Sequence, residues 1–309
     1  MTEPAEVSRT RAWLIAARPH TLPAAASPVI VGTGLAVHDG VFSPFPALAA
    51  LVGAGLIQIG TNLANDYYDA RKGTDAGAEG FTRVTQAGLI PPDRVKRATV
   101  ATFALAILVG GYLVLRGGVP IVIIGLASIA SGILYTGGPY PFGYHGLGDL
   151  FTFVFFGLVA VTGTYYVQAV GAIGPLPLWI PDGTITLDAV VASLPMAALI
   201  TDILVVNNVR DLETDRAAGK RTLAVFLGYA GSRIEFVGLL LLAYAVPGWF
   251  VVRGYSLWVL LPLLTAPYAA SVARTLLTRT GGESLNIALE RTGRLTALYA
   301  IAFGVGLAI

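Results

Sequence analysis

The stretch Asn62-Leu63-Ala64-Asn65-Asp66-Tyr67-Tyr68-Asp69 ends a long apolar segment of this chain. A second phrase, Asn207-Asn208-Val209-Arg210-Asp211-Leu212-Glu213-Thr214-Asp215, ends another apolar segment 145 residues later. In both phrases an Asn precedes an Asp by four residues, and a further Asp follows three or four residues on. On an α-helix such spacings place the side chains on one face, about one turn apart. Two apolar helices that end in stacked oxygen ligands are therefore expected.

The stacked carboxylates predict a metal site. Asp66 and Asp69 lie about 40° and about 20° from Asn62 around a helix, and the Asn207, Asp211, Asp215 series drifts by about 80°. Carboxylates held this close repel one another unless they share a cation. Magnesium takes oxygen ligands and commonly bridges carboxylates to phosphates, so the two phrases predict a site for Mg²⁺ and a diphosphate. The alternative, simple anchoring at a membrane interface, suits basic or aromatic residues better than acids.

The composition is that of an all-α, polytopic membrane protein. The chain is 55% hydrophobic and 12% charged, and its mean hydropathy is +0.72, far from the average soluble domain. It has no cysteine, which excludes disulfides and thiolate metal sites. Its three histidines, His20, His38 and His145, are too scattered to predict a histidine metal site.

We expect nine membrane-spanning helices. Each is close to the roughly 20 residues needed to cross a bilayer. The expected spans are Leu22–Val37, Pro46–Asn65, Ala98–Leu115, Val119–Tyr135, Leu147–Gln168, Leu187–Asn208, Ile234–Val252, Leu257–Thr275 and Ala288–Ile309.

The loop charges orient these spans. Eighteen of the 20 Lys and Arg residues fall on one side, and only Arg116 and Arg253 on the other. Because positive loops stay in the cytoplasm, this bias predicts a cytoplasmic N-terminus, a C-terminus on the opposite side, and both Asp phrases at the cytoplasmic face of the cell membrane.

The two phrases also indicate an internal repeat. One domain, 1–309, is expected, with related halves of roughly 1–145 and 146–309 that face one site. No segment indicates a nucleic acid or an obligate protein as a partner.

Basic side chains accompany both phrases. Positive-inside bias explains some of them, but the oxygens of a diphosphate also need donors. We therefore predict that the substrate is contacted by Lys72, Arg83, Lys220 and Arg18.

Two further acids have open roles. Asp202 lies inside an apolar segment, nine residues before Asp211, and so faces away from the metal stripe; a structural hydrogen bond is expected for it. Asp149 follows a Gly-rich turn and either favours a helix N-terminus or contacts an acceptor substrate. Tyrosines such as Tyr144 suit a membrane interface and could also face a carbocation.

These phrases together resemble the UbiA superfamily of intramembrane aromatic prenyltransferases, over almost the whole chain. The resemblance rests on both Asp phrases and on several stretches between them. These are Ala17 to Pro23, Arg83 to Ile90, Tyr135 to Pro139, Gly143 to Asp149, Gly163 to Tyr166 and Asn207 to Leu223. The stretches between the Asp phrases are similar to the branch that prenylates 1,4-dihydroxy-2-naphthoate in menaquinone synthesis.

The resemblance implies a site and a reaction. It implies nine helices around a central cavity that opens to the cytoplasmic side and laterally to lipid. It also implies two Mg²⁺ ions and a polyprenyl diphosphate. The implied ligands are Asn65, Asp66, Asp69, Asp211 and Asp215, assisted by Asn62 and Asn207, with Asn208 beside them. Many members carry a third Asp where this chain has Gly73, and Asp75 is the candidate substitute. The implied product is a demethylmenaquinol, formed with loss of CO₂ and diphosphate, whose lipid tail leaves into the bilayer.

Alternatives remain open at this level. The acceptor could be of the 4-hydroxybenzoate or homogentisate type. A membrane lipid phosphotransferase also uses Asp clusters, but with different Gly and Asp spacing. A transporter would place its acids near the middle of the bilayer rather than at one face.

Overall fold

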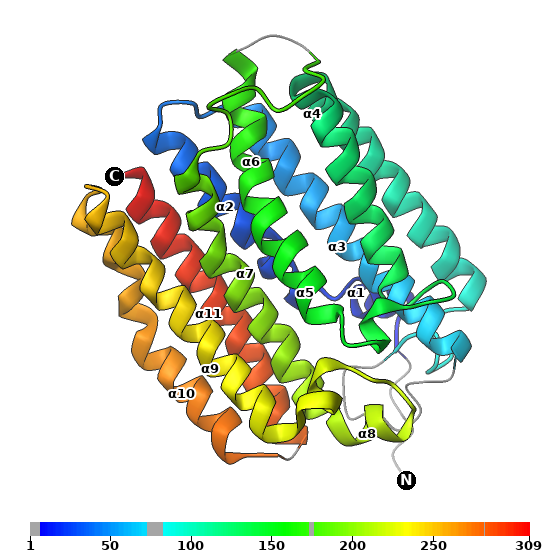
Figure 1. Ribbon diagram of the computed structural model, residues 1–309. Helices are drawn as coiled ribbons and strands as arrows, with labels where there is room; N and C mark the ends of the chain where they lie inside the picture. The colour runs from blue at the N-terminus through cyan, green and yellow to red at the C-terminus, as the bar shows by residue number, and fades with distance from the viewer. Residues whose placement is uncertain (1–6, 73–82, 173–175, 281) are drawn as a thin grey trace.

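The chain folds into one bundle of long helices (Figure 1). The structure, a computed structural model, describes residues 7–72, 83–172, 176–280 and 282–309. Those residues form helices and connecting segments and contain no strand, which confirms the all-α prediction. The longer helices are α2 (Leu22–His38), α3 (Pro44–Lys72), α4 (Pro92–Leu134), α6 (Ala160–Ala169), α7 (Leu187–Arg210), α9 (Leu223–Val252), α10 (Ala266–Thr278) and α11 (Gly282–Ala308). The shorter ones are α1 (Arg9–Ala17), η1 (Pro19–Thr21), η2 (Phe142–Tyr144), α5 (Gly148–Thr152), η3 (Phe153–Val159), η4 (Val170–Ala172), α8 (Leu212–Ala217) and η5 (Leu257–Thr265).

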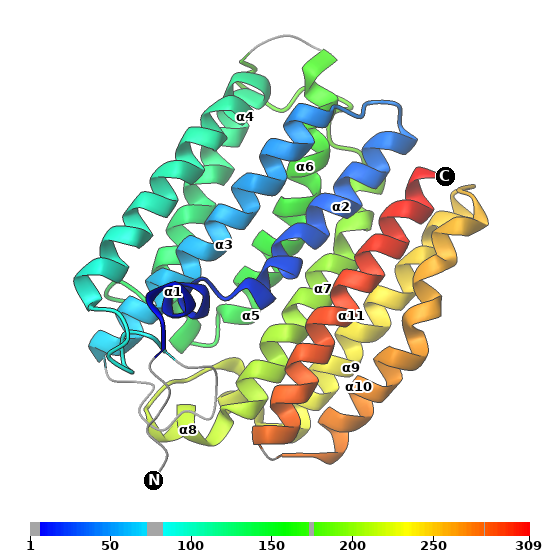
Figure 2. The ribbon, with the colours of Figure 1, turned by 180° about the vertical axis from the view of Figure 1, so that it is seen from behind.

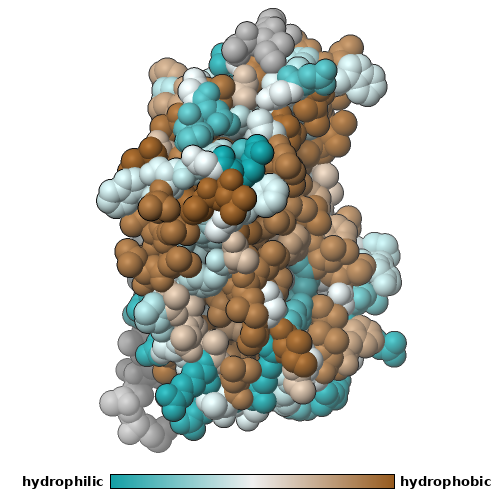
Figure 3. All heavy atoms as spheres, turned by 60° about the vertical axis from the view of Figure 1, so that its left-hand side comes forward, coloured by the Kyte–Doolittle hydropathy of each residue, from teal (hydrophilic) through white to brown (hydrophobic). Residues whose placement is uncertain are grey.

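Seven helical stretches within the described residues are long and apolar enough to cross a membrane. Apolar side chains dominate the middle of the face in Figure 3, and hydrophilic ones gather toward its upper and lower ends. Many large apolar side chains on the bundle are exposed, such as Leu108 at 71% and Ile123 at 62%. Exposed apolar area of this extent is stable only against lipid. The protein is therefore a multi-pass membrane protein.

A sharp turn divides α4 at Gly118, whose φ of 64° and ψ of −150° are not helical. Val119 N–H there donates to the Pro177 carbonyl over 3.0 Å. A Cβ on Gly118 would lie 1.9 Å from that same carbonyl oxygen, so only glycine fits. The sequence placed a break between Leu115 and Val119, which this turn confirms. The exact count of nine spans stays a prediction.

Close backbone contacts join the helices into a ring. α3 packs against α4, α2 against α11 and α6, and α7 against α9, η3 and α11. A Cβ on Gly34 of α2 would lie 2.2 Å from the Gly304 carbonyl of α11, and one on Gly157 of η3 would lie 2.1 Å from the Ala197 side chain of α7. Small residues at such crossings let helix backbones approach one another in lipid. Figure 2 shows α2 and α11 side by side.

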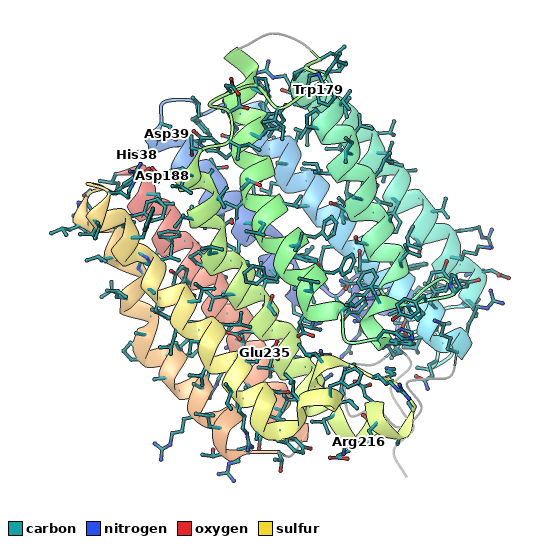
Figure 4. The ribbon with its side chains drawn as sticks, viewed as in Figure 1. His38, Asp39, Trp179, Asp188, Arg216 and Glu235 are labelled. Atoms are coloured by element: carbon teal, nitrogen blue, oxygen red, sulfur yellow. The ribbon has the colours of Figure 1, made fainter. Side chains whose placement is uncertain are left out.

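A polar cluster ties four helices together at the end of the bundle opposite α1 and α8. Tyr165 of α6 donates to Asp39 at the end of α2 over 2.6 Å. Tyr255, just after α9, donates to Asp188 at the start of α7 over 3.1 Å, and its ring stacks on His38 at 4.2 Å. Figure 4 labels His38, Asp39 and Asp188 together at this end. We call Asp39, Tyr165, Asp188 and Tyr255 the latch.

The latch predicts a purely structural phenotype. Tyr165→Phe removes the donor to Asp39, an exposed carboxylate that water can still solvate, so the lost hydrogen bond should cost about 0.5–1.5 kcal/mol. The variant should unfold at a lower temperature in detergent and keep its activity per folded molecule. Arg216→Ala, at an exposed pair with Glu213, is the control and should unfold like the native chain. A Tyr165→Phe protein with unchanged thermal stability would contradict the assignment.

Candidate active site

A large cavity occupies the middle of the ring, with a volume of about 1460 Å³. Side chains from α2, α3, α4, η3, α6, α7 and α11 line it. One end holds nearly all of its charged groups, and the remainder is mostly apolar or small, with Gly110, Gly111 and Gly125 in its wall. A Cβ at any of these three glycines would meet nothing within 4 Å, so this part of the cavity is open space. A charged head with a long apolar tail matches this division.

The first Asp phrase forms the last turns of α3. Asp69 lines the cavity, is 2% exposed, and pairs with Arg83 over 3.1 Å. The Tyr144 hydroxyl also donates to Asp69. Arg83 and Tyr144, two predicted substrate contacts, therefore both bind Asp69 of the first Asp phrase and line the cavity.

The Asp66 carboxylate points away from the cavity, unlike that of Asp69. Its Oδ2 accepts hydrogen bonds from Thr85, over 3.0 Å from the backbone N–H and 2.6 Å from the hydroxyl. The residue is 2% exposed and is not part of the cavity wall. These bonds tie the end of α3 to the segment that carries Arg83, so in this structure Asp66 positions the arginine that pairs with Asp69.

The second phrase spans a break in the helix. α7 ends at Arg210, and Asp211 has a φ of −94° and a ψ of 8°, outside the α-helical range, before α8 begins at Leu212. The break lets Asp211 turn back toward its sequence neighbour. Arg210 grips both carboxylate oxygens, with Nε 2.8 Å from Oδ1 and Nη2 2.6 Å from Oδ2.

Asp215, on α8, carries the third basic partner. Lys220 Nζ lies 3.2 Å from its Oδ1, and both residues line the cavity. The Lys220 Nζ also lies 5.2 Å from the centre of the Tyr144 ring, and Lys72 Nζ lies 4.9 Å from it. Tyr144 thus contacts basic residues of both phrases. Lys72 itself is not in the cavity wall, and it donates to the Thr136 carbonyl over 2.6 Å.

The remaining predicted contacts mostly line the cavity. The residues in the wall are Arg18, Asn62, Asn65, Asn207 and Asn208. The Asn62 amide is committed to the chain, because it donates to the Ala17 carbonyl and to Thr21 Oγ1, each over 3.0 Å. Asn65 Oδ1 accepts from Thr136 Oγ1 over 2.9 Å.

Asp149 and Asp202 are buried but lie outside the cavity wall. Asp149 Oδ2 has no hydrogen-bond partner within the described residues. Burial raises the pKa of the neighbouring Tyr135 phenol, and the charges of Asp149, Asp215 and Asp69 raise that pKa further. Acids from both phrases therefore converge around Tyr135.

Asp202 faces away from the cavity, as the helical angle predicted. The structural hydrogen bond expected for it is absent, since neither carboxylate oxygen has a partner in the part of the chain that the structure describes. Asp202 interacts electrostatically with Glu235 of α9, which Figure 4 labels. Gly73 and Asp75, the departure and its suggested substitute, lie outside the described residues.

The sequence does not predict the contacts made by Arg210, Thr85 and Asn286. Positive-inside bias is enough to explain an arginine at position 210, and Thr85 belongs only to a stretch that resembles the family. No sequence pattern marks Asn286 of α11. Arg210 Nη1 donates to Asn286 Oδ1 over 3.0 Å, and Nη2 to Asn207 Oδ1 over 2.9 Å. A helical wheel directs Arg210 and Asp211 about 100° apart, so only the break after α7 brings them together.

The donor set fits magnesium bound together with a phosphate. Carboxylates of Asp69, Asp211 and Asp215 face one cavity, with amide groups beside them. No group of three acids or histidines among the described residues is close enough to enclose a metal by itself. Magnesium is commonly held by one or two carboxylates plus substrate phosphates rather than by an all-protein cage.

The sequence pattern of the UbiA prenyltransferase family matches residues 25–295. The chain belongs to this family. It is 39% identical to the 1,4-dihydroxy-2-naphthoate octaprenyltransferase of Escherichia coli, over 99% of this chain and 98% of that protein. It is 38% identical to the protein of the same name from Mycobacterium tuberculosis, over 96% of each.

Solved structures share the fold. A UbiA homologue from Archaeoglobus fulgidus, bound to DMAPP and Mg²⁺, superposes with a TM-score of 0.63 at 17% identity, covering 96% of this chain and 98% of that one. The homologue from Aeropyrum pernix gives a TM-score of 0.65 at 14% identity, covering 92% and 96%.

Asp202, buried within α7, and Asp211, partly exposed just after it, predict opposite phenotypes. Asp202→Asn removes an ionisable group with no hydrogen-bond partner from an apolar core, so the variant should keep its turnover and be at least as stable as the native chain. Asp211→Asn removes charge from the cavity and should lose turnover by about 100-fold or more. Both are measured as prenyl transfer per folded molecule in detergent. Equal losses in the two variants, at equal expression, would contradict this placement.

Proposed function

We propose that this protein transfers a polyprenyl group from polyprenyl diphosphate to 1,4-dihydroxy-2-naphthoate, with loss of CO₂ and diphosphate, and yields a demethylmenaquinol. The observation that carries the proposal is the convergence of acids and bases from two distant helix ends on the charged end of one apolar cavity. The near full-length likeness to naphthoate octaprenyltransferases supports the choice of acceptor.

The charged end would bind the diphosphate. Asp69, Asp211 and Asp215 would hold Mg²⁺, one ion at each phrase, with Asn65 offering an amide oxygen. The Asn207 amide oxygen would keep its hydrogen bond to Arg210. Magnesium bound there would neutralise the charge that grows on the diphosphate as the allylic C–O bond breaks. The remaining phosphate oxygens would accept hydrogen bonds from Arg83 and Lys220, which already line the cavity.

Asp66 would act on this site through Thr85. Its two hydrogen bonds to Thr85 hold the segment that bears Arg83 against α3. The role of Asp66 as a metal ligand stays a prediction, because in this structure its carboxylate is bound to Thr85 and lies outside the cavity wall. Lys72 would act through Tyr144, because its Nζ lies 4.9 Å from the centre of the Tyr144 ring.

The apolar part of the cavity would take the prenyl chain. Its wall is formed by small and aliphatic residues of α3 and α4 and by the aromatic rings of Phe151, Phe155 and Phe156. A dry apolar wall excludes water, which would otherwise capture the allylic cation. The aromatic faces and the Tyr144 ring would stabilise the positive charge while the acceptor approaches.

The acceptor ring would attack through the carbon that bears its carboxylate. One C–C bond forms to the allylic cation, the bond to the carboxylate breaks, and its electron pair returns to the ring as CO₂ leaves. No proton has to be removed for this exchange, so the reaction needs no general base at that carbon. The ring hydroxyl groups make the carbon electron-rich enough to react.

The cell membrane would be the site of action, with the N-terminus and the charged end of the cavity at the cytoplasmic face. Both substrates then reach the charged end, one from the cytoplasm and one from the bilayer. The bias of 18 basic residues to one side supports this orientation.

Competition between two acceptors tests the proposal. Purified protein receives one polyprenyl diphosphate, Mg²⁺, and equal amounts of carboxyl-labelled 1,4-dihydroxy-2-naphthoate and 4-hydroxybenzoate. The expected result is prenylated naphthoate with one labelled CO₂ released per product, and little product from 4-hydroxybenzoate. Preferential prenylation of 4-hydroxybenzoate with its carboxylate retained would assign the protein to a different acceptor.

A further inference from the structure

Arg210 makes several hydrogen bonds at the charged end of the cavity. Its guanidinium bonds to both oxygens of Asp211, to Asn207 Oδ1 and to Asn286 Oδ1, over 2.6 to 3.0 Å. Its side chain is only 4% exposed. Asn286 belongs to α11, so one arginine connects the break after α7 to another wall of the cavity.

The Arg210–Asp211 ion pair is shorter than the other two ion pairs at the charged end. For Asp69–Arg83 and Asp215–Lys220 the nearest charged atoms are 3.1 Å and 3.2 Å apart. The Arg210 fork is shorter and bidentate, the geometry in which guanidinium–carboxylate bonds are strongest. It takes one lone pair on each oxygen of Asp211 and neutralises the carboxylate, so it weakens the attraction of Asp211 for a cation.

A metal cation that binds Asp211 therefore competes with the guanidinium for the charge of one carboxylate. A buried guanidinium released from its carboxylate cannot stay unpaired without a large cost. The amide oxygens of Asn207 and Asn286 keep it at the cavity wall but carry no charge. The diphosphate is the anion whose oxygens could accept the guanidinium hydrogen bonds in place of Asp211.

We propose that Arg210 is an exchangeable counter-ion, which competes with magnesium for Asp211 and moves to the diphosphate oxygens, while Asn207 and Asn286 hold its guanidinium in place. This proposal rests on the proposed function. Its consequence is coupling: metal binds weakly by itself and much more tightly with diphosphate, because the two ligands together satisfy both Asp211 and Arg210.

Direct metal binding tests this exchange without turnover. Free Mn²⁺ is titrated by electron paramagnetic resonance into purified protein, with and without an unreactive prenyl thiodiphosphate. In Arg210→Gln, Mn²⁺ alone should bind about tenfold tighter, the equivalent of one charge-assisted hydrogen bond removed from Asp211. The thiodiphosphate raises Mn²⁺ affinity in the native chain, and this increase should be smaller in Arg210→Gln by a similar factor. The guanidinium that would bind the thiodiphosphate is absent from the variant.

Two further variants separate competition from simple charge. Arg210→Lys keeps the positive charge but cannot fork around a carboxylate, so it should also bind Mn²⁺ more tightly than the native chain. It also serves if Arg210→Gln fails to fold. Arg294→Gln removes a cation from the same cavity wall, where Arg294 bonds to Glu290 and touches no motif carboxylate; its Mn²⁺ affinity should stay native.

The outcomes are distinct. Unchanged Mn²⁺ affinity in both Arg210 variants would overturn the exchange. A gain in Arg294→Gln as large as in Arg210→Gln would also overturn it, since the effect would then be one of net charge. A native chain that transfers no prenyl group, yet shows the Arg210 effect on Mn²⁺, would contradict the proposed function and leave the exchange standing.

Discussion

The ion pairs at the charged end of the cavity are the constraint on which the rest of the structure depends. Three carboxylates, Asp69, Asp211 and Asp215, are kept in an otherwise apolar bundle, and each is paired with a base. A buried charge without a partner would cost several kcal/mol. In the proposed function each pair would exchange partners, because a metal can replace the base on the carboxylate and a phosphate can replace the carboxylate on the base. The pairs that stabilise the site would then be the groups that bind a metal–diphosphate complex.

The opposite end of the bundle has the complementary task. The latch joins α2 to α6 and α7 to the segment after α9 through tyrosine–aspartate bonds. It holds the helices together at the end away from the site, while the breaks after α7 and within α4 set the shape of the cavity. Charged chemistry is concentrated at one end, structural hydrogen bonds at the other, and an apolar cavity runs between them.

Much of this could be predicted from the sequence. Hydropathy and loop charge predicted the apolar helices, because lipid forces every backbone group into helical hydrogen bonds. The Asp phrases predicted the charged end, since stacked acids at a membrane face have few other uses. Arg83, Tyr144 and Lys220 were all found next to the predicted acids.

Departures from regular helix limited the rest. The helical wheel treated 207–215 as one straight helix, and the break at Asp211 turned that carboxylate onto Arg210 instead. The helical wheel places Asp66 and Asp69 on the same face, but the Asp66 carboxylate accepts a hydrogen bond from Thr85, 19 residues away in the sequence. The Asn286 contact with Arg210 spans 76 residues. Long-range contacts of this kind depend on how helices pack, and no local spacing encodes them.

The central claim is that two motifs 145 residues apart act on one metal–diphosphate group. The most direct test measures the hyperfine coupling between bound Mn²⁺ and the phosphorus of an unreactive prenyl thiodiphosphate, by electron–nuclear double resonance. The account predicts a phosphorus coupling in the native chain that is lost in Asp69→Asn and equally in Asp215→Asn. Full retention of the coupling in either variant would show that one motif does not hold the metal–diphosphate group, and would contradict the account.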